Sequence, residues 1–187
     1  MSVVLFVQQT CPISLQEIAS GTEDAFRILF NLSRKPIVTT IFDAADRQGD
    51  PSMPKVGRGS RRVLCSLDGY PEQVAASPIV VPHGTLGERG DWSFADRDLI
   101  SIRWQMYKSP LCYALQAAIA IAIAQRMNSM IEDGAGFFSI SNESTSTEFA
   151  DALRLPWAQM DIRSAAEEFL KRRPGLLSSP DPARPLQ

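Results

Sequence analysis

Histidine, paired cysteines and nucleotide-binding glycine loops are scarce or absent in this sequence. It has one histidine, His83, and three widely spaced cysteines, and it contains no C-x-x-C pair, H-E-x-x-H segment, P-loop or G-x-S-x-G elbow. Zinc hydrolases, P-loop nucleotide-binding proteins and nucleophile-elbow hydrolases usually carry one of these patterns. The usual signature of each class is therefore missing, and we predict no catalytic residues, no metal and no cofactor.

An excess of positive charge is also lacking. The formal net charge is −2 and the sequence pI is about 5.5. Nucleic acids and anionic membrane surfaces attract basic proteins, so we expect neither as a partner. The N-terminus has no positively charged segment before an apolar stretch, and the odd number of cysteines fits reduced, buried thiols. These features predict a cytoplasmic protein.

The order of apolar segments predicts an α+β fold. Short β-branched or alternating runs indicate strands, and longer runs behind capping residues indicate helices. The predicted single domain, residues 1–173, holds a mixed sheet of five or six strands packed against one buried helix, with further C-terminal helices. The predicted strands cover residues 3–7, 37–42, 62–67, 79–81, 99–107 and 137–140.

The predicted helices differ in the strength of their signals. The strongest begins at the N-cap pair Ser109-Pro110 and runs to about residue 131. Its alanine-rich stretch, residues 111–124, is shorter than the roughly 20 residues that cross a bilayer, so it predicts a core helix covered by the sheet and by another helix. Weaker patterns predict a helix over 14–34 that breaks near Gly21, a capped helix over 145–154 and a last helix starting at Ser164.

Two segments have too few apolar residues to join the core. Residues 44–60 are rich in Gly, Pro and Asp, so we expect a flexible loop there. Residues 174–187 form a Pro-rich tail that we expect to be disordered. His83-Gly84 reads as the start of a turn, and Pro78 and Pro82 place the strand between them at a sheet edge.

Three groups of residues are candidates for chemistry or binding. His83 on a loop would suit a general base, although a turn histidine is the more ordinary interpretation. The segment 57–62 presents glycines and arginines that would suit a phosphate, although a solvated loop is favoured. Eight acidic residues against two arginines lie between 128 and 170, which suits docking of a basic partner. Within that segment our candidate partner-binding residues are Glu132, Asp133, Glu143, Glu148 and Asp151.

One stretch resembles a known class of proteins. Residues 114–153, from the alanine-rich helix through the acidic and glycine turn to a capped helix, resemble small bacterial proteins of the polymorphic-toxin immunity type. The resemblance implies a protein that binds a cognate toxin without catalysing a reaction, and together with the acidic segment it predicts a basic toxin or effector domain as the partner. Two alternatives remain: an unfamiliar, hydrolase-like enzyme using His83 with turn carboxylates, and a homo-oligomer, such as a homodimer, that covers the alanine-rich helix with its own copy.

Overall fold

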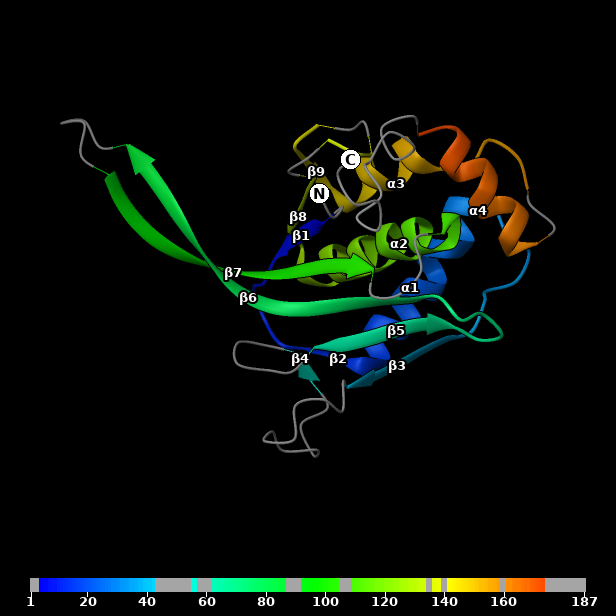
Figure 1. The fold of residues 1–187 in the computed structure, drawn as a ribbon, viewed down its shortest axis with the longest axis horizontal. Coiled ribbons are helices and arrows are strands. Elements are labelled where there is room, and N and C mark those ends of the chain that lie inside the picture. The colour runs from blue at the N-terminus through cyan, green and yellow to red at the C-terminus, as the bar shows by residue number, and fades with distance from the viewer. Residues whose placement is uncertain are drawn as a thin grey trace, which may run out of the picture.

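A computed structural model describes residues 4–42, 55–56, 62–86, 92–104, 109–133, 136–138, 141–158 and 161–173. Within them a seven-stranded sheet packs against helices, which confirms the α+β class (Figure 1). The predicted tail 174–187 lies outside the described residues, as does most of the predicted loop 44–60. Only Lys55–Val56 of that loop is described, as strand β4.

The main sheet has the strand order β3-β5-β6-β7-β1-β8-β9. All its pairings are antiparallel, so the prediction of a mixed sheet was wrong in that respect, and the strand number is one or two higher than expected. A second, two-stranded sheet pairs β2 (Ile13–Ser14) with β4. The strands of the main sheet are β1 (Leu5–Gln8), β3 (Val38–Phe42), β5 (Val63–Leu67), β6 (Gln73–Leu86), β7 (Trp92–Trp104), β8 (Met130–Glu132) and β9 (Glu143–Thr145).

Helix α2 (Pro110–Met127) forms the centre of the core. Its length and composition alone would allow it to cross a membrane, but 83% of its residues are buried inside the fold. One side packs on the sheet, and α1, α3 and α4 cover the others (Figure 1). The one strongly polar side chain in its middle, Gln116, donates from Nε2 to the carbonyl of Ile102 at 2.7 Å, which offsets part of the cost of burying it. The predicted core helix is confirmed.

Helix α1 (Leu15–Phe30) is continuous, so the predicted break near Gly21 was wrong. Ser14 and Glu17 form a capping box at its start. A Cβ on Gly21 would lie 2.9 Å from the Cβ of Ala122, so this glycine allows α1 and α2 to touch closely. The glycine that looked like a helix breaker in the sequence is a packing contact between two helices.

Helices α3 (Ser146–Leu153) and α4 (Ile162–Lys171) lie on the side of α2 away from the sheet. The Thr145 cap of α3 is as predicted, whereas α4 is capped by Asp161 and not by a residue at 164. A chain of ring contacts joins these helices to α1, with centroid distances from 5.5 to 6.4 Å. Its members come from three helices and one turn: Phe26, Phe30, Phe169, Phe138 and Phe149.

The chain after α2 differs from the prediction. The helix ends at Asn128, whose left-handed backbone (φ 49°) closes the last turn, and not at about residue 131. The next strand is β8, which pairs with β1. Phe137 and Phe138, predicted to begin a strand, lie in a turn, and residues 139–140 are outside the described part of the chain.

Strands β6 and β7 extend beyond the rest of the sheet as a two-stranded arm, which we define as residues 80–86 and 92–98 (Figure 1). The predicted short strand 79–81 is thus part of a longer one, and the predicted strand 99–107 begins at Trp92. His83-Gly84 lies within β6, where the prediction had a turn. The two prolines that suggested an edge are tolerated because β5 stops pairing with β6 at Ala76.

Candidate partner-binding surface

The β8–β9 ladder and α3 bring four of the five predicted contact residues to one end of the sheet. Glu132 and Glu143 are direct register partners across the two strands. Strand β9 leads straight into α3, which carries Glu148 and Asp151 one turn apart. We call Glu132, Glu143, Glu148 and Asp151 the acidic edge.

Solvent reaches most of the acidic edge. Glu143, Glu148 and Asp151 are exposed and Glu132 is partly buried. No ion pair between described residues involves Glu143, Glu148 or Asp151. Glu132 and Glu143 lie directly opposite each other, and Glu148 and Asp151 follow on α3. These four carboxylates concentrate negative charge at this end of the sheet.

Asp133 does not belong to this surface, and its prediction as a contact residue was wrong. Its side chain is fully buried and accepts hydrogen bonds from the backbone N–H groups of Phe137 (3.3 Å) and Phe138 (2.9 Å). Its own N–H donates to the carbonyl of Asn142. Asp133 therefore closes the turn that carries Phe138 into the aromatic chain, because a short acidic side chain readily accepts from amides a few residues ahead.

Glu148 combines exposure with a structural task. Its carboxylate accepts from the backbone N–H of Thr145 at 2.9 Å and from the Thr145 hydroxyl at 2.8 Å, completing the capping box of α3. The bond from the Thr145 backbone lowers the pKa of this carboxyl. Glu148 thus keeps its negative charge at the helix start but has less freedom to turn toward a partner.

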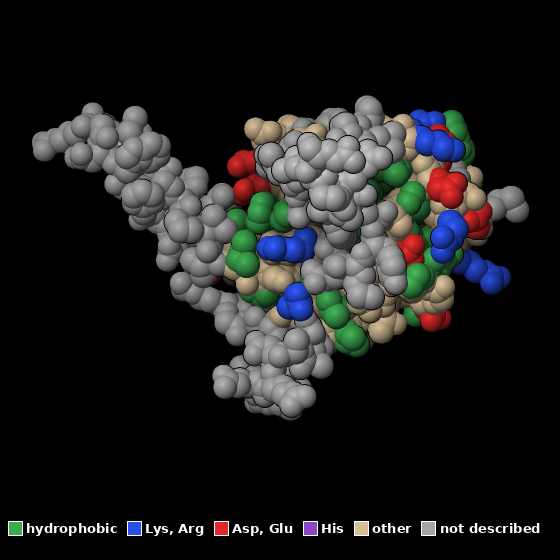
Figure 2. All heavy atoms as spheres, viewed as in Figure 1, with side chains coloured by type: hydrophobic (Ala, Val, Ile, Leu, Met, Phe, Trp, Pro, Cys, Tyr) green, Lys and Arg blue, Asp and Glu red, His purple; other side chains and the backbone are tan. Residues whose placement is uncertain are grey.

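Two other acids of the predicted segment, Asp161 and Glu168, are occupied within the fold, whereas Glu167 is exposed on α4. Asp161 accepts from the Ser164 N–H as the cap of α4, which lowers the pKa of the Asp161 carboxyl. Glu168 pairs with Arg172 at 2.8 Å, and Arg172 stacks on Trp157. Figure 2 shows acidic and basic side chains intermingled at the α4 end of the molecule. The negative surface is therefore smaller than the sequence count suggested.

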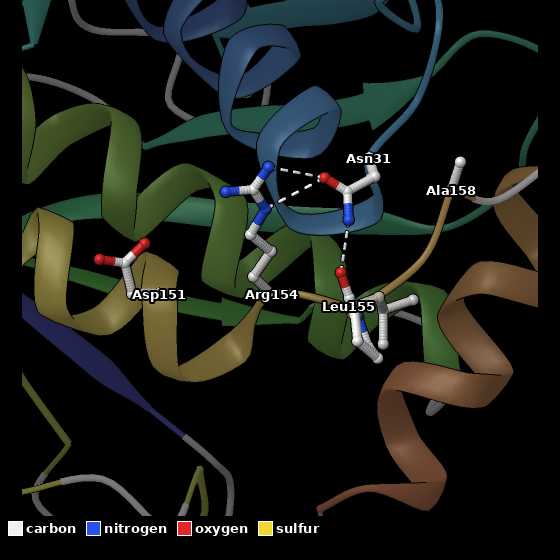
Figure 3. Close-up of a pocket in the computed structure, with 6 residues that line it drawn as sticks. Asn31, Asp151, Arg154, Leu155 and Ala158 are labelled. Carbon is white, nitrogen blue, oxygen red and sulfur yellow. Dashed lines mark hydrogen bonds between the residues drawn. The ribbon is translucent and has the colours of Figure 1, made fainter.

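A shallow depression of about 520 Å³ lies at the far end of α3, beside Asp151. Arg154 spans it, donating from Nε and Nη2 to Oδ1 of Asn31 at 3.0 and 2.7 Å. Asn31 in turn donates to the Leu155 carbonyl. Figure 3 shows the Arg154 guanidinium directed at Asn31, with the Asp151 carboxylate set apart from it on α3. The arginine therefore joins α3 to the end of α1 and leaves the charge of Asp151 in place.

Comparison with family models, curated proteins and solved structures finds no match. The function must therefore be argued from the geometry of this chain.

A second depression, of about 510 Å³, lies where α1 crosses α2. It contains the ion pair between Glu17 and Arg126, whose Oε1 and Nε atoms are 2.7 Å apart. The Ser14 backbone N–H, together with Arg126, lowers the pKa of Glu17 to about 2. Both interactions fix the start of α1 against the end of α2, which makes this a structural ion pair.

The remaining candidates for chemistry gain no support from the geometry. Among the described residues no three His, Cys, Asp or Glu side chains lie together as a metal would require. Burial raises the pKa of the Cys65 thiol to about 12 and also raises the pKa of Cys112, which makes both thiols poor nucleophiles. The backbone of His83 lies on the arm opposite Ala95, and the predicted phosphate loop is outside the described residues apart from Arg62.

Proposed function

We propose that this chain is a non-enzymatic binding protein, specifically a cytoplasmic immunity protein that neutralises a cognate bacterial toxin by direct binding. The observation that carries the proposal is the acidic edge: Glu143, Glu148 and Asp151 are exposed together at the end of the sheet. The likeness of residues 114–153 to immunity-type proteins favours the same interpretation.

The exposed negative charge of the acidic edge suits a basic protein partner. Exposed carboxylates of one sign steer an oppositely charged surface and raise its association rate, more than they raise affinity at equilibrium. Strand β9 is also the last strand of the sheet order, and among the described residues it pairs only with β8. Charge and an open strand edge therefore coincide, and both favour association with another chain.

Charge reversal tests the proposal on the residues that have no capping role. The double variant Glu143→Lys/Asp151→Lys replaces two exposed acids and leaves the Thr145–Glu148 capping box intact. Products of neighbouring genes are first screened by pull-down, and the binding of any that are captured is then measured by calorimetry and stopped-flow at low and high salt. We expect an association rate about tenfold lower or more at low salt, with most of the difference lost at high salt.

Glu167→Lys is the matched control, because Glu167 is an exposed acid on α4 that lies outside the acidic edge. It changes the net charge in the same direction and should leave the rate within about twofold, since one distant charge is largely screened. Equal effects of Glu167→Lys and either single reversal at the edge would show that only net charge matters. Unchanged binding by the double variant would remove the acidic edge as the contact surface.

A further inference from the structure

The arm is a ribbon of two strands with no third strand beside it among the described residues. Seven register pairs, from Val80↔Asp98 to Leu86↔Trp92, run without interruption along it. On one side β5 ends its pairing at Ala76, and on the other β1 ends its pairing at Leu99. Two-stranded ribbons in water are marginally stable, and a third or fourth strand stabilises them.

The register determines which backbone groups of the arm point outward. In an antiparallel pair, alternate residues direct both N–H and C=O toward the neighbouring strand or away from it. The Asp98 carbonyl accepts from the N–H of Gln9, so Asp98 points away from β6. Even-numbered residues of the arm therefore face outward on both strands, and odd-numbered residues bond across the ribbon.

The two outer edges of the arm differ in one respect. On β6, the outward positions from 78 to 86 include Pro78 and Pro82, which have no N–H to donate. On β7, the outward positions Trp92, Phe94 and Asp96 all have an N–H and a C=O. Proline on an edge is a common means of preventing strand pairing, so the β6 edge is blocked and the β7 edge is open.

We propose that the β7 edge of the arm pairs with the β7 edge of a second copy of this chain, giving a four-stranded antiparallel ribbon about a two-fold axis. A two-fold axis places one edge against itself, so each outward N–H meets an outward C=O of the same three residues. The bodies of the two copies then lie at opposite ends of the joined arms. This dimer is independent of the acidic edge, which is on a different part of the sheet.

The register of the dimer follows from which backbone groups of β7 are free to pair and from the charge of the residues brought together. A two-fold axis perpendicular to the ribbon can lie at an outward or at an inward residue. A centre at Ala95 would pair Trp92 with Asp98 of the other copy, whose carbonyl is already bonded to Gln9. A two-fold axis at Asp96 would place the Asp96 carboxylates of the two copies opposite each other, which is unfavourable. It would also pair Phe94 of one copy with Asp98 of the other, whose carbonyl is already bonded to Gln9. A centre at Phe94 matches Trp92 of each copy with Asp96 of the other and uses every outward group.

Sedimentation equilibrium over a wide concentration range tests whether the dimer forms and which edge forms it. We expect wild-type protein to dimerise and Phe94→Pro to raise the dimer Kd by about tenfold or more, because it removes the two central N–H donors of the pairing. The Phe94→Pro substitution removes no hydrogen bond between β6 and β7 within either copy, because the Phe94 N–H points away from β6. The control Val80→Pro removes an outward N–H on β6 and should leave the Kd unchanged. A wild-type monomer at all concentrations, or equal effects of the two prolines, would overturn the proposal.

Cysteine cross-linking tests the register in a Cys11→Ser background, because Cys65 and Cys112 are buried. At the two-fold centre the Cα atoms of Phe94 and its copy lie about 5.5 Å apart, within the reach of a disulfide. Phe94→Cys should therefore give a covalent dimer on mild oxidation. Gly84→Cys, opposite Phe94 in the same hairpin, should not, because its copy is three strand spacings of about 4.8 Å away. Cross-linking of both variants or of neither would contradict the register.

Discussion

Helix α2 and the β6–β7 arm are two long elements of the same chain, yet their surroundings are opposite. Fifteen of the eighteen residues of α2 are buried, by the sheet on one side and by three helices on the others. The two strands of the arm pair only with each other among the described residues, and no described helix lies over them (Figure 1). The burial of α2 and the isolation of the arm therefore follow from the topology, which places three helices around α2 and no described helix over the arm.

The difference also assigns roles to the two segments. A helix buried on all sides specifies packing, because each side chain has several neighbours that would have to move if it changed. A ribbon with an open edge keeps unpaired backbone groups available to another chain. The buried helix and the open ribbon are thus separated along the sequence by only the residues between Asp98 and Pro110.

The largest expected effect comes from placing the same residue, proline, in both segments. Ala118→Pro removes a hydrogen bond in the middle of α2 and forces a ring into a filled interior, so we expect a loss of more than about 3 kcal/mol of folding free energy. Ala95→Pro breaks the cross-strand bonding at the middle of the arm and should leave the unfolding midpoint of the body nearly unchanged. Urea unfolding followed by circular dichroism measures both. Equal destabilisation would mean that the arm and the body fold as one unit.

A smaller effect tests how closely α2 is covered by α1. Gly21→Val places a branched side chain where even a single Cβ would be 2.9 Å from Ala122, so α1 must shift. We expect destabilisation of about 1–3 kcal/mol. The neighbouring exposed residue provides the control, since Ser20→Val also adds a branched side chain to α1 but at an exposed position, and should change stability by less than about 0.5 kcal/mol. Comparable losses would show that propensity and not packing governs this site.

The cap of α3 tests the outer cover of α2. Thr145→Ala removes the hydroxyl that accepts from the Glu148 N–H and leaves the Glu148 carboxylate with one donor fewer. We expect a loss of about 1 kcal/mol in thermal unfolding experiments. Ser146→Ala, one residue further on and outside the capping box, should be close to neutral, and a larger loss there would indicate a different helix start.

The smallest effect is a pH dependence at the α1–α2 crossing. Because the folded pKa of Glu17 is lowered to about 2 from its ordinary 4.5, its ionised form stabilises the fold above pH 4.5, and this contribution is lost as the pH falls from 4.5 toward 2. The Glu17 side chain is 37% exposed, so we expect less than about 1 kcal/mol. Glu17→Gln keeps a capping acceptor but loses the charge. Its Tm should lie below wild type at pH 7 and meet it near pH 2; a constant difference would assign the effect to the cap alone.

Local signals in the sequence predicted most elements of the body. The Ser109-Pro110 start of α2, the Thr145 cap of α3 and the β-branched runs of β1 and β3 depend on neighbouring residues alone, so they can be recognised without the fold. Gly21 was misread because its effect depends on Ala122, about a hundred residues away. The end of α2 was misplaced because Asn128 took the left-handed cap that a glycine more often provides.

The candidate surface was less predictable than the fold. Charge counting treated Asp133, Glu148 and Asp161 alike, yet one is buried in a turn and two cap helices. The Thr-x-x-Glu spacing at 145–148 was a visible sign that Glu148 has a structural role. No local pattern revealed the length of the arm. Pro78 and Pro82 suggested a sheet edge, but His83-Gly84 suggested a turn, and only the pairing with β7 shows that β6 continues to Leu86.

Strand β1 has a consequence for the way this chain is made. Its two neighbours are β7 and β8, so Leu5 lies opposite Ile102 and Val7 opposite Ile131. Strand β1 must therefore wait, unpaired, until the roughly 90 residues that separate it from its partner in β7 have been synthesised. Closing such distant contacts is slow, and an apolar strand without its neighbours invites capture by chaperones or by other nascent chains.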